Sequence, residues 1–475
     1  MGLELDYIFH PRSIAIAGAS ESPEKFGHTY FKNVLENFSG RVYPVNARAT
    51  EILGVPTYKS VRDIPGEVDY VVSAVPNRDA LDLVNDCISK GVKTLHFFTA
   101  RFSETGSEEG AQMERDMLAR AKIAGMRILG PNCMGLYYPK IGMAWGRDFP
   151  LEHGNVGIIS QSGGNAGEMI STGAVRGLQF SKVISYGNAL DLNEADLVEY
   201  LADDPETEII GGYIEGVKDG RRFATALRYA SSRKPVILLK GGRTQAGTNM
   251  ASSHTGALAS ARGVWEAMCQ QMGVINALSL EELLDSLVAL TRMPSATGLN
   301  LLVGGGTGGK GVMSADECEE EGLHLSPIPG DVREELIERD PFFGAWVTNP
   351  VDGSIMGGSK LTPHEVITLI AKHPSYDAVI NGISASVPSN RRRPTRPTRA
   401  TRMLEHTMAI ANDQGKPVAL VISDHTPGDE RLLKATVELR RQCVKDGFAV
   451  FPTVGRAGRA IKRLVDYYRW RKETD

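Results

Sequence analysis

His254 lies in the segment SSHTGALA, residues 252–259, where small residues flank it and a helix is expected to follow. A neutral imidazole can attack a phosphoryl group at neutral pH, because its pKa is about 6.5. A buried acid on the other ring nitrogen would fix the tautomer of the ring. Glu215, at the end of a predicted strand, is the candidate for that acid. The alternatives are a histidine without a catalytic role and a glutamate exposed at the sheet edge.

A second candidate is the segment SQSGGNAG, residues 160–167, which joins a predicted strand to a predicted helix. Ser162, Gly163 and Gly164 would present a hydroxyl and backbone N–H groups at the positive end of that helix, which suits a phosphate. The Walker lysine is missing, so the segment does not predict an ATPase loop. A strand-to-helix turn without a ligand is the alternative.

The segment IAIAGASESPEKFG, residues 14–27, also leads from a predicted strand to a predicted helix, through a turn that begins at Gly18. Such a turn suits a phosphate. The dinucleotide fingerprint is not met, because Ser20 stands where a glycine would let a pyrophosphate approach the backbone. Asn46 stands where a ribose-binding acid is expected. Both residues argue against an NAD-linked dehydrogenase and favour another ligand with a nucleotide tail.

Two further segments follow predicted strands directly. In AVPN, residues 74–77, the proline fixes the chain just outside the sheet, where Rossmann-type ligands lie. In GPNCMG, residues 130–135, the amide of Asn132 can donate to a carboxylate or thioester oxygen. We expect a structural role for the Cys133 thiol, because the sequence places no base beside it.

Short β-branched runs alternate with amphipathic helical stretches along nearly the whole chain, which predicts α/β domains with parallel sheets and helices on both faces. At about 150 residues per domain, 475 residues correspond to about three domains. The alternation restarts twice, after a Pro- and Gly-rich stretch near 138–154 and after the predicted linker 293–298. We therefore expect three domains, at residues 1–140, 150–293 and 299–475.

Composition excludes several classes of protein. A net charge of −4 argues against a dedicated nucleic-acid binder. No apolar run approaches the ~20 residues of a membrane-spanning helix, and no signal peptide is evident, so we expect a cytoplasmic protein without a membrane partner. The five cysteines form no C-x-x-C pair, which argues against disulfides and zinc fingers. No metal site is expected.

Together these segments resemble the α subunit of the NDP-forming acyl-CoA synthetases, relatives of succinyl-CoA synthetase, and in particular the ADP-forming acetate–CoA ligase type. The resemblance covers most of the chain, and order and spacing agree. It rests on the segments IAIAGAS, GRVYPVN, AVP, GMRILGPNCMG, ISQSGG, YGNALDLNEADLVEYLADDPET, YIEGVKDGRRF, KPVILLKGGRT, SSHTGALA and NPVDG.

The resemblance implies a Rossmann-like CoA-binding domain followed by two flavodoxin-like domains, the second of which contacts another subunit. It implies that His254 is phosphorylated in turnover, that Glu215 orients it, and that the phosphate rests on Ser162, Gly163 and Gly164. Asn132 would lie at the acyl carboxylate. Roles in binding coenzyme A are implied for seven residues, namely Gly18, Ser20, Lys25, Asn46, Val75, Pro76 and Thr99.

The resemblance also implies a partner. A β subunit with an ATP-grasp domain would bind ATP or ADP with magnesium, and no stretch of this chain is left to hold that domain. The implied assembly is α2β2, which converts a small carboxylic acid, CoA and ATP to acyl-CoA, ADP and phosphate. The alternative is a non-catalytic regulatory protein that binds CoA or acyl-CoA with the same fold.

Three segments depart from the family pattern or remain unassigned. Arg101, in FFTARF, stands where the family usually has a glycine, and it could pair with an anionic substrate. Gly304–Gly311 is rich in glycine and carries Lys310, but it fits neither the Walker nor the dinucleotide pattern. Arg391–Arg402 holds six arginines and no acid. We expect a solvated loop there, with a phosphate-contacting or subunit-facing loop as the alternative.

Overall fold

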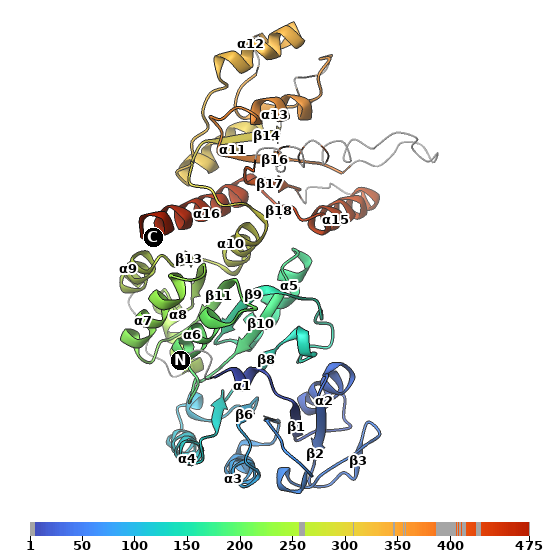
Figure 1. Ribbon diagram of the computed structural model, residues 1–475, viewed down its shortest axis with the longest axis vertical. Helices are drawn as coiled ribbons and strands as arrows, with labels where there is room; N and C mark the ends of the chain where they lie inside the picture. The colour runs from blue at the N-terminus through green and yellow to red at the C-terminus, as the bar shows by residue number, and fades with distance from the viewer. Residues whose placement is uncertain are drawn as a thin grey trace. The chain divides into compact units, whose positions relative to one another are not determined.

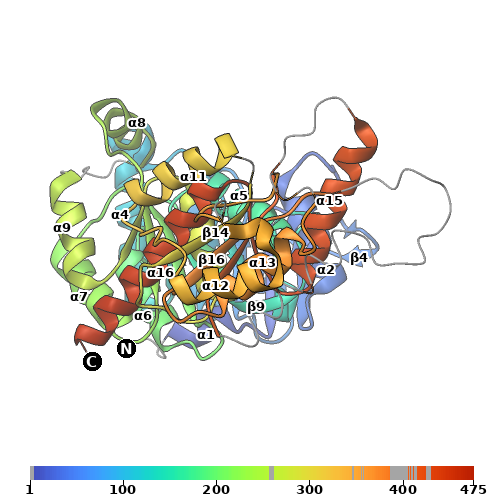
Figure 2. The same cartoon turned by 90° about the horizontal axis from the view of Figure 1, so that it is seen from above.

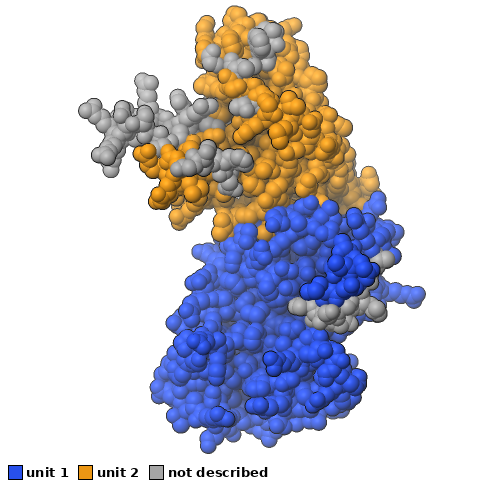
Figure 3. All heavy atoms as spheres, turned by 180° about the vertical axis from the view of Figure 1, so that it is seen from behind, with its two compact units in different colours: residues 1–174, 178–283 blue, residues 175–177, 284–475 orange. Residues whose placement is uncertain are grey.

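The structure is a computed structural model, and its packing divides the chain into two compact units (Figure 3). The first unit holds residues 1–174 and 178–283, and the second holds residues 175–177 and 284–475. The described residues are 5–255, 262–306, 308–344, 347–354, 356, 358–385, 405, 407, 410, 415–423 and 429–474.

Among its described residues, the first unit contains two large sheets and a two-stranded one. All five strands of its first sheet are parallel, in the order β2-β1-β5-β6-β7 (Figure 1). These strands are β1 (Ser13–Ala17), β2 (Arg41–Val45), β5 (Tyr70–Ser73), β6 (Thr94–Phe97) and β7 (Arg127–Leu129). Helices α3 (Ala80–Lys90) and α4 (Glu108–Ala124) pack side by side over a core that includes Val71 and Leu95, while α2 (Phe26–Asn37) lies against β1 and β2. A small hairpin, β3 (Glu51–Ile52) with β4 (Val55–Pro56), follows β2.

The second sheet of this unit has the order β13-β12-β11-β9-β10-β8. Its strands are β8 (Gly135–Tyr137), β9 (His153–Ser160), β10 (Phe180–Ser185), β11 (Ile209–Ile214), β12 (Val236–Lys240) and β13 (Ile275–Ala277). Its helices are α5 (Gly163–Val175), α6 (Glu194–Asp203), α7 (Gly220–Ser231), α8 (Gln245–Thr255) and α9 (Arg262–Met272), and α10 (Leu280–Arg292) follows β13. Strand β8 is antiparallel to β10, an exception to the predicted all-parallel pattern.

The second unit contains one parallel sheet with the order β15-β14-β16-β17-β18. Its strands are β14 (Leu301–Gly306), β15 (Val351–Asp352), β16 (Ala378–Gly382), β17 (Val418–Val421) and β18 (Ala449–Phe451). Figure 2 shows α11 (Gly308–Glu320) and α16 (Val454–Thr474) on one side of it and α13 (Pro363–Ala371) on the other. Helices α12 (Gly330–Arg339) and α15 (Glu430–Lys445) complete the described part, and most of the helix predicted over 401–413 lies outside it.

The three large sheets share one connectivity. When the parallel strands are numbered along the chain within each sheet, their spatial order is 2-1-3-4-5, the flavodoxin-like arrangement. In such sheets ligands bind beyond the carboxyl ends of strands 1 and 3, where the strand order reverses. The structure therefore offers three candidate sites, beyond β1 and β5, beyond β9 and β11, and beyond β14 and β16.

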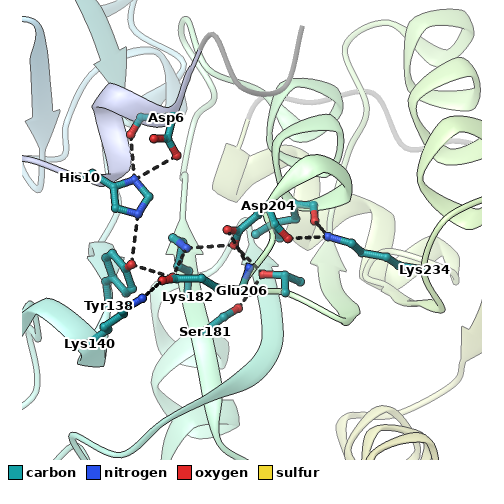
Figure 4. Close-up of polar contacts among 11 residues, drawn as sticks. Asp6, His10, Tyr138, Lys140, Ser181, Lys182, Asp204, Glu206 and Lys234 are labelled. Carbon is teal, nitrogen blue, oxygen red and sulfur yellow. Dashed lines mark hydrogen bonds and ion pairs between the residues drawn. The ribbon is translucent and has the colours of Figure 1, made fainter.

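A buried polar cluster ties the N-terminal helix α1 (Asp6–Phe9) region to the second sheet (Figure 4). Lys182, on β10, is fully buried and donates to Asp204 Oδ2 at 2.9 Å and to Glu206 Oε2 at 2.8 Å. Tyr138 donates to Glu206 Oε2 at 2.6 Å, and the His10 ring contacts the Tyr138 hydroxyl at 3.1 Å. The cluster therefore fixes the segment before β1 to the second sheet, although the two are far apart in the sequence.

The cluster predicts a dependence of stability on pH. Burial alone would raise the pKa of Glu206, but hydrogen bonds from Lys140, Lys182 and Tyr138 lower it from 4.5 to about 2. A carboxyl whose pKa is lower in the folded state stabilises the fold above its unfolded pKa, and this contribution disappears as pH falls through the folded pKa. We expect Glu206→Gln to lower the free energy of unfolding. The difference from the unaltered protein should be largest above pH 4.5 and should shrink as the pH falls toward about 2. Urea unfolding of both proteins across this range measures the difference, and a pH-independent difference would contradict the prediction.

Two kinds of feature are absent from the described residues. No helix there is long and apolar enough to cross a membrane. In the same part of the chain, no group of three or more histidine, cysteine, aspartate or glutamate side chains could hold a metal ion.

Candidate functional site

The first site lies where β1 and β5 end. Gly18 has φ +92°, and a Cβ there would lie 2.7 Å from the carbonyl oxygen of Ala74. The Ala74 N–H donates to the carbonyl of Ala17 at 2.8 Å, which keeps the two strand ends together. Only glycine fits this turn, and the missing side chain leaves the backbone open to a close ligand. Gly18 and Val75, which were predicted from two separate segments, are therefore neighbours at the same site.

Asn46 and Ser20 shape the loop that follows Gly18. The Asn46 amide donates to the carbonyl of Ala19 at 2.8 Å and accepts N–H groups from Arg48 and Ala49 at 2.8 and 2.9 Å. Ser20 Oγ accepts the N–H of Ser22 at 3.1 Å. Both residues therefore stabilise the loop through hydrogen bonds, and their roles in binding a ligand stay predictions. Lys25 is exposed at the start of α2, and its side chain makes no capping hydrogen bond there.

Thr99 connects this site to Asn132. Thr99 Oγ1 donates to the carbonyl of Val75 at 2.6 Å, and its own carbonyl accepts the N–H of Asn132 at 3.0 Å. Pro76 is exposed and caps the short helix η3 (Asn77–Asp79). The predicted residues Val75, Thr99 and Asn132 therefore line up along the carboxyl edge of the first sheet.

Cys133 lies beneath this edge. Its thiol is buried and directed at the carbonyl of Phe97, 3.7 Å away. Burial raises the pKa of the thiol far above its ordinary value, which makes it a poor nucleophile. The expected structural role agrees with this environment.

Arg101 occupies a backbone conformation that favours glycine. Its φ is +75°, its side chain is exposed, and its carbonyl accepts from the Asn77 amide at 2.9 Å. Its N–H donates to the carboxylate of Glu104. A glycine would adopt this φ without strain, so the arginine is held here in a conformation that is unusual for a residue with a Cβ.

We expect Arg101→Gly to stabilise the protein by up to about 1 kcal/mol, because the Cβ clash of a left-handed residue disappears. The measurement is the midpoint of thermal unfolding, with Arg78→Gly, at an exposed position without positive φ, as the control that should not stabilise. A lower midpoint for Arg101→Gly than for the unaltered protein would show that the arginine side chain stabilises the loop.

The second site lies where β9 and β11 end. Helix α5 begins at Gly163, and Ser162 Oγ accepts the N–H of Asn165 at 3.3 Å. Ser160 Oγ donates to the carbonyl of Ser162 at 2.7 Å and holds the turn. Gly164 is exposed in the first turn of the helix. The N-terminal N–H groups of a helix carry partial positive charge, so this turn has the chemistry of an anion site.

Glu215 is buried beside this turn, with 6% of its surface exposed. Gln161 Oε1 accepts the backbone N–H groups of Glu215 at 2.8 Å and Gly216 at 3.0 Å, so it binds the two loops to each other. Burial and the Glu215 carboxylate raise the pKa of Tyr213, and burial lowers the pKa of Lys240. The alternative of an exposed edge glutamate is excluded.

His254 was expected in a loop before a helix, but the structure includes its backbone in α8. Its side chain lies outside the described residues, as do residues 256–261 that follow the helix. The contact of His254 with Glu215 therefore stays a prediction.

In the third sheet, Gly304–Gly306 end β14 and Gly308–Gly311 begin α11. A cavity of about 180 Å³ lies beside them, and Lys310 lines it. These glycines therefore form a strand end and a helix start at the third candidate site. The arginine-rich segment Arg391–Arg402 lies outside the described residues.

Comparison with known families agrees with this architecture. Residues 12–139 match the CoA binding domain, residues 153–290 the succinyl-CoA ligase like flavodoxin domain, and residues 301–422 the ligase-CoA domain. The three sheets thus belong to a CoA-binding domain and two domains of the succinyl-CoA ligase type.

Curated relatives are similar over most of the chain. The α subunit of ADP-forming acetate–CoA ligase II from Pyrococcus furiosus is 41% identical over 376 residues, which are 79% of this chain and 81% of the relative. The α subunit of ligase I from the same organism is 34% identical over 99% of both chains. The ADP-forming acetate–CoA ligase of Methanocaldococcus jannaschii is 38% identical, but this chain covers only 49% of it.

A solved structure is also similar. The acetyl-coenzyme A synthetase 1 of Ca. Korarchaeum cryptofilum, in complex with phosphate and ADP, has a TM-score of 0.82 and 33% identity. The match covers 99% of this chain and 98% of that one. The fold and these matches define a CoA-binding protein of the acyl-CoA synthetase class. More narrowly, the chain belongs to the family of the α subunits of ADP-forming acetate–CoA ligases.

Proposed function

We propose that this chain is the α subunit of an ADP-forming acid–CoA ligase, and that it uses His254 as a phosphoryl carrier. The observation that supports this most is the second site, where the buried Glu215 and the N-terminal turn of α5 are tied together by Gln161. An acid that orients an imidazole and a helix start that holds a phosphate are the two parts a phosphohistidine needs.

The proposed reaction divides a hard condensation into transfers. The γ-phosphoryl group passes from ATP to His254, and then from His254 to an oxygen of a carboxylic acid, which gives an acyl phosphate. The sulfur of CoA attacks the acyl carbon, and phosphate leaves as the thioester forms. Asn132 binds the acid, and the turn at Gly18 receives CoA.

We further propose a partner subunit that carries an ATP-grasp domain and binds ATP with magnesium, in an α2β2 assembly. The length of the Methanocaldococcus relative, about half of which is matched, supports a second functional part on another chain. Within this chain, residues 1–140 would bind CoA, residues 150–293 would carry the phosphohistidine, and residues 299–475 would contact the partner. Relatives named as ligases disfavour the non-catalytic regulator.

The test mixes the chain with the candidate ATP-grasp subunit, magnesium, ATP, CoA and a panel of carboxylic acids. Formation of thioester, ADP and phosphate in equal amounts is expected with at least one acid. A chain that binds CoA, but gives no thioester with any acid and no phosphorylated protein, would support the regulator instead.

A further inference from the structure

Asn188 connects the proposed acyl residue Asn132 to two carboxylates of the first sheet's helices. Asn188 lies in the turn between β10 and α6, and only 4% of its surface is exposed. Its Nδ2 donates to Glu104 Oε2 at 2.7 Å and to Glu114 Oε1 at 3.0 Å. Its Oδ1 accepts from Asn132 Nδ2 at 3.4 Å. Glu114 is also buried, so the chain of contacts is largely shielded from water.

These contacts settle which way both amides point. Carboxylate oxygens accept hydrogen bonds, so the NH2 group of Asn188 faces Glu104 and Glu114. Its oxygen must then face Asn132, and Asn132 must turn its own NH2 group toward Asn188. An isolated asparagine could flip its amide freely, but here two carboxylates exclude the flipped form.

The backbone holds the two turns together without help from the Asn188 side chain. The N–H of Asn188 donates to the carbonyl of Pro131 at 3.0 Å, and the N–H of Leu190 donates to that of Gly130 at 2.9 Å. Gly187 has φ +55°, and a Cβ there would lie 2.2 Å from the Pro131 carbonyl oxygen. Removing the Asn188 amide should therefore leave the turns in place.

We propose that Asn188 is a positioning residue for the acid substrate: it fixes the Asn132 amide so that a remaining N–H of that amide is available to a carboxylate oxygen. A flipped Asn132 would turn its own oxygen to the substrate's oxygen and repel it. This proposal rests on the proposed function, because it takes Asn132 as the acyl residue. It adds that specificity for the acid depends on a contact between the first and second sheets.

The test is a double-mutant cycle in the complete complex with its partner subunit. Asn188→Ala is expected to raise KM for the acid about tenfold, the scale of one lost oriented hydrogen bond. KM for CoA and the rate of His254 phosphorylation should stay within about twofold, a change below the usual coupling between contacting residues. In an Asn132→Ala background, Asn188→Ala should change KM for the acid by less than about twofold, since it acts through Asn132.

Two further variants keep the result interpretable. Glu104→Gln combined with Glu114→Gln keeps the volumes but lets the Asn188 amide flip, so KM for the acid should rise again. Asn155→Ala, which removes an exposed pair with Glu208 in the same unit, is the matched control and should change nothing. CoA binding by each variant reports whether it is folded.

Two results would overturn the role of Asn188. One is that Asn188→Ala impairs KM for the acid, KM for CoA and the rate of His254 phosphorylation to the same extent. The other is that Asn188→Ala has its full effect on KM for the acid even when Asn132 is already alanine. Failure of the unaltered complex to form thioester or phosphohistidine would instead overturn the proposed function, and this role with it. Normal turnover with an unresponsive KM for the acid overturns the positioning role alone.

Discussion

Replacing His254 with asparagine is expected to lower thioester formation by about 10⁴-fold or more, the scale of loss when a covalent nucleophile is removed. Asparagine offers an amide of similar polarity but no nitrogen that can carry a phosphoryl group. Direct attack of the acid on ATP would require both to reach one site, which the proposed division of labour between two subunits prevents. The measurement is thioester formation by the complex at saturating ATP, CoA and acid.

Labelling separates this loss from misfolding. With γ-labelled ATP the unaltered complex should carry acid-labile, base-stable phosphate on this chain, and His254→Asn should carry none. CoA binding should be retained by the variant, because the first site lies on other strands. His153→Asn, at the exposed start of β9, is the control and should behave as the unaltered protein. Full thioester formation by His254→Asn would refute the phosphohistidine mechanism.

Much of the fold could be predicted because many strands are short runs of apolar and β-branched residues that can be recognised locally in the sequence. The sequence predicts strands at Ser13–Ala17, Arg41–Val45 and Phe180–Ser185, and the structure has strands with these bounds. Ser13–Ala17 is buried at every position and mostly apolar, so it can be recognised without knowledge of its partner strands. Arg41–Val45 begins exposed and Phe180–Ser185 contains the buried Lys182, so these two fit the pattern less well. Strand β8 could not be found in this way, because three residues carry no periodicity and become a strand only by pairing with β10.

The candidate site was predictable in its parts but not in its connections. Glu215 and Ser162 were identified from separate segments, whereas Gln161 and Asn188 were missed. Their amides form hydrogen bonds between loops from distant parts of the chain. The spacing of residues along the sequence does not show that these loops are in contact. The one local signal for Gln161 is its place directly before Ser162, at a strand end. Asn46 shows the converse, since a polar residue at an expected ligand position also holds its own loop.

The largest loss of stability is expected from Lys182→Met. Lys182 is fully buried, pairs with Asp204 and Glu206, and lies 4.4 Å above the centre of the Tyr138 ring (Figure 4). Removing the ammonium leaves two carboxylates, one of them also fully buried, without their shared cation. Breaking a buried pair in this way costs about 3–5 kcal/mol, so the free energy of unfolding should fall by that amount. Urea unfolding followed by circular dichroism measures it.

Lys140→Met is the matched control, because Lys140 also contacts Glu206 but its side chain is 53% exposed. An exposed pair contributes about 0–1 kcal/mol, so this variant should lose little. The double variant Lys182→Met with Asp204→Leu should recover part of the loss, since it removes a stranded charge and restores apolar packing. Equal losses for Lys182→Met and Lys140→Met would contradict this argument, because both lysines contact Glu206 but only Lys182 is fully buried and also pairs with Asp204.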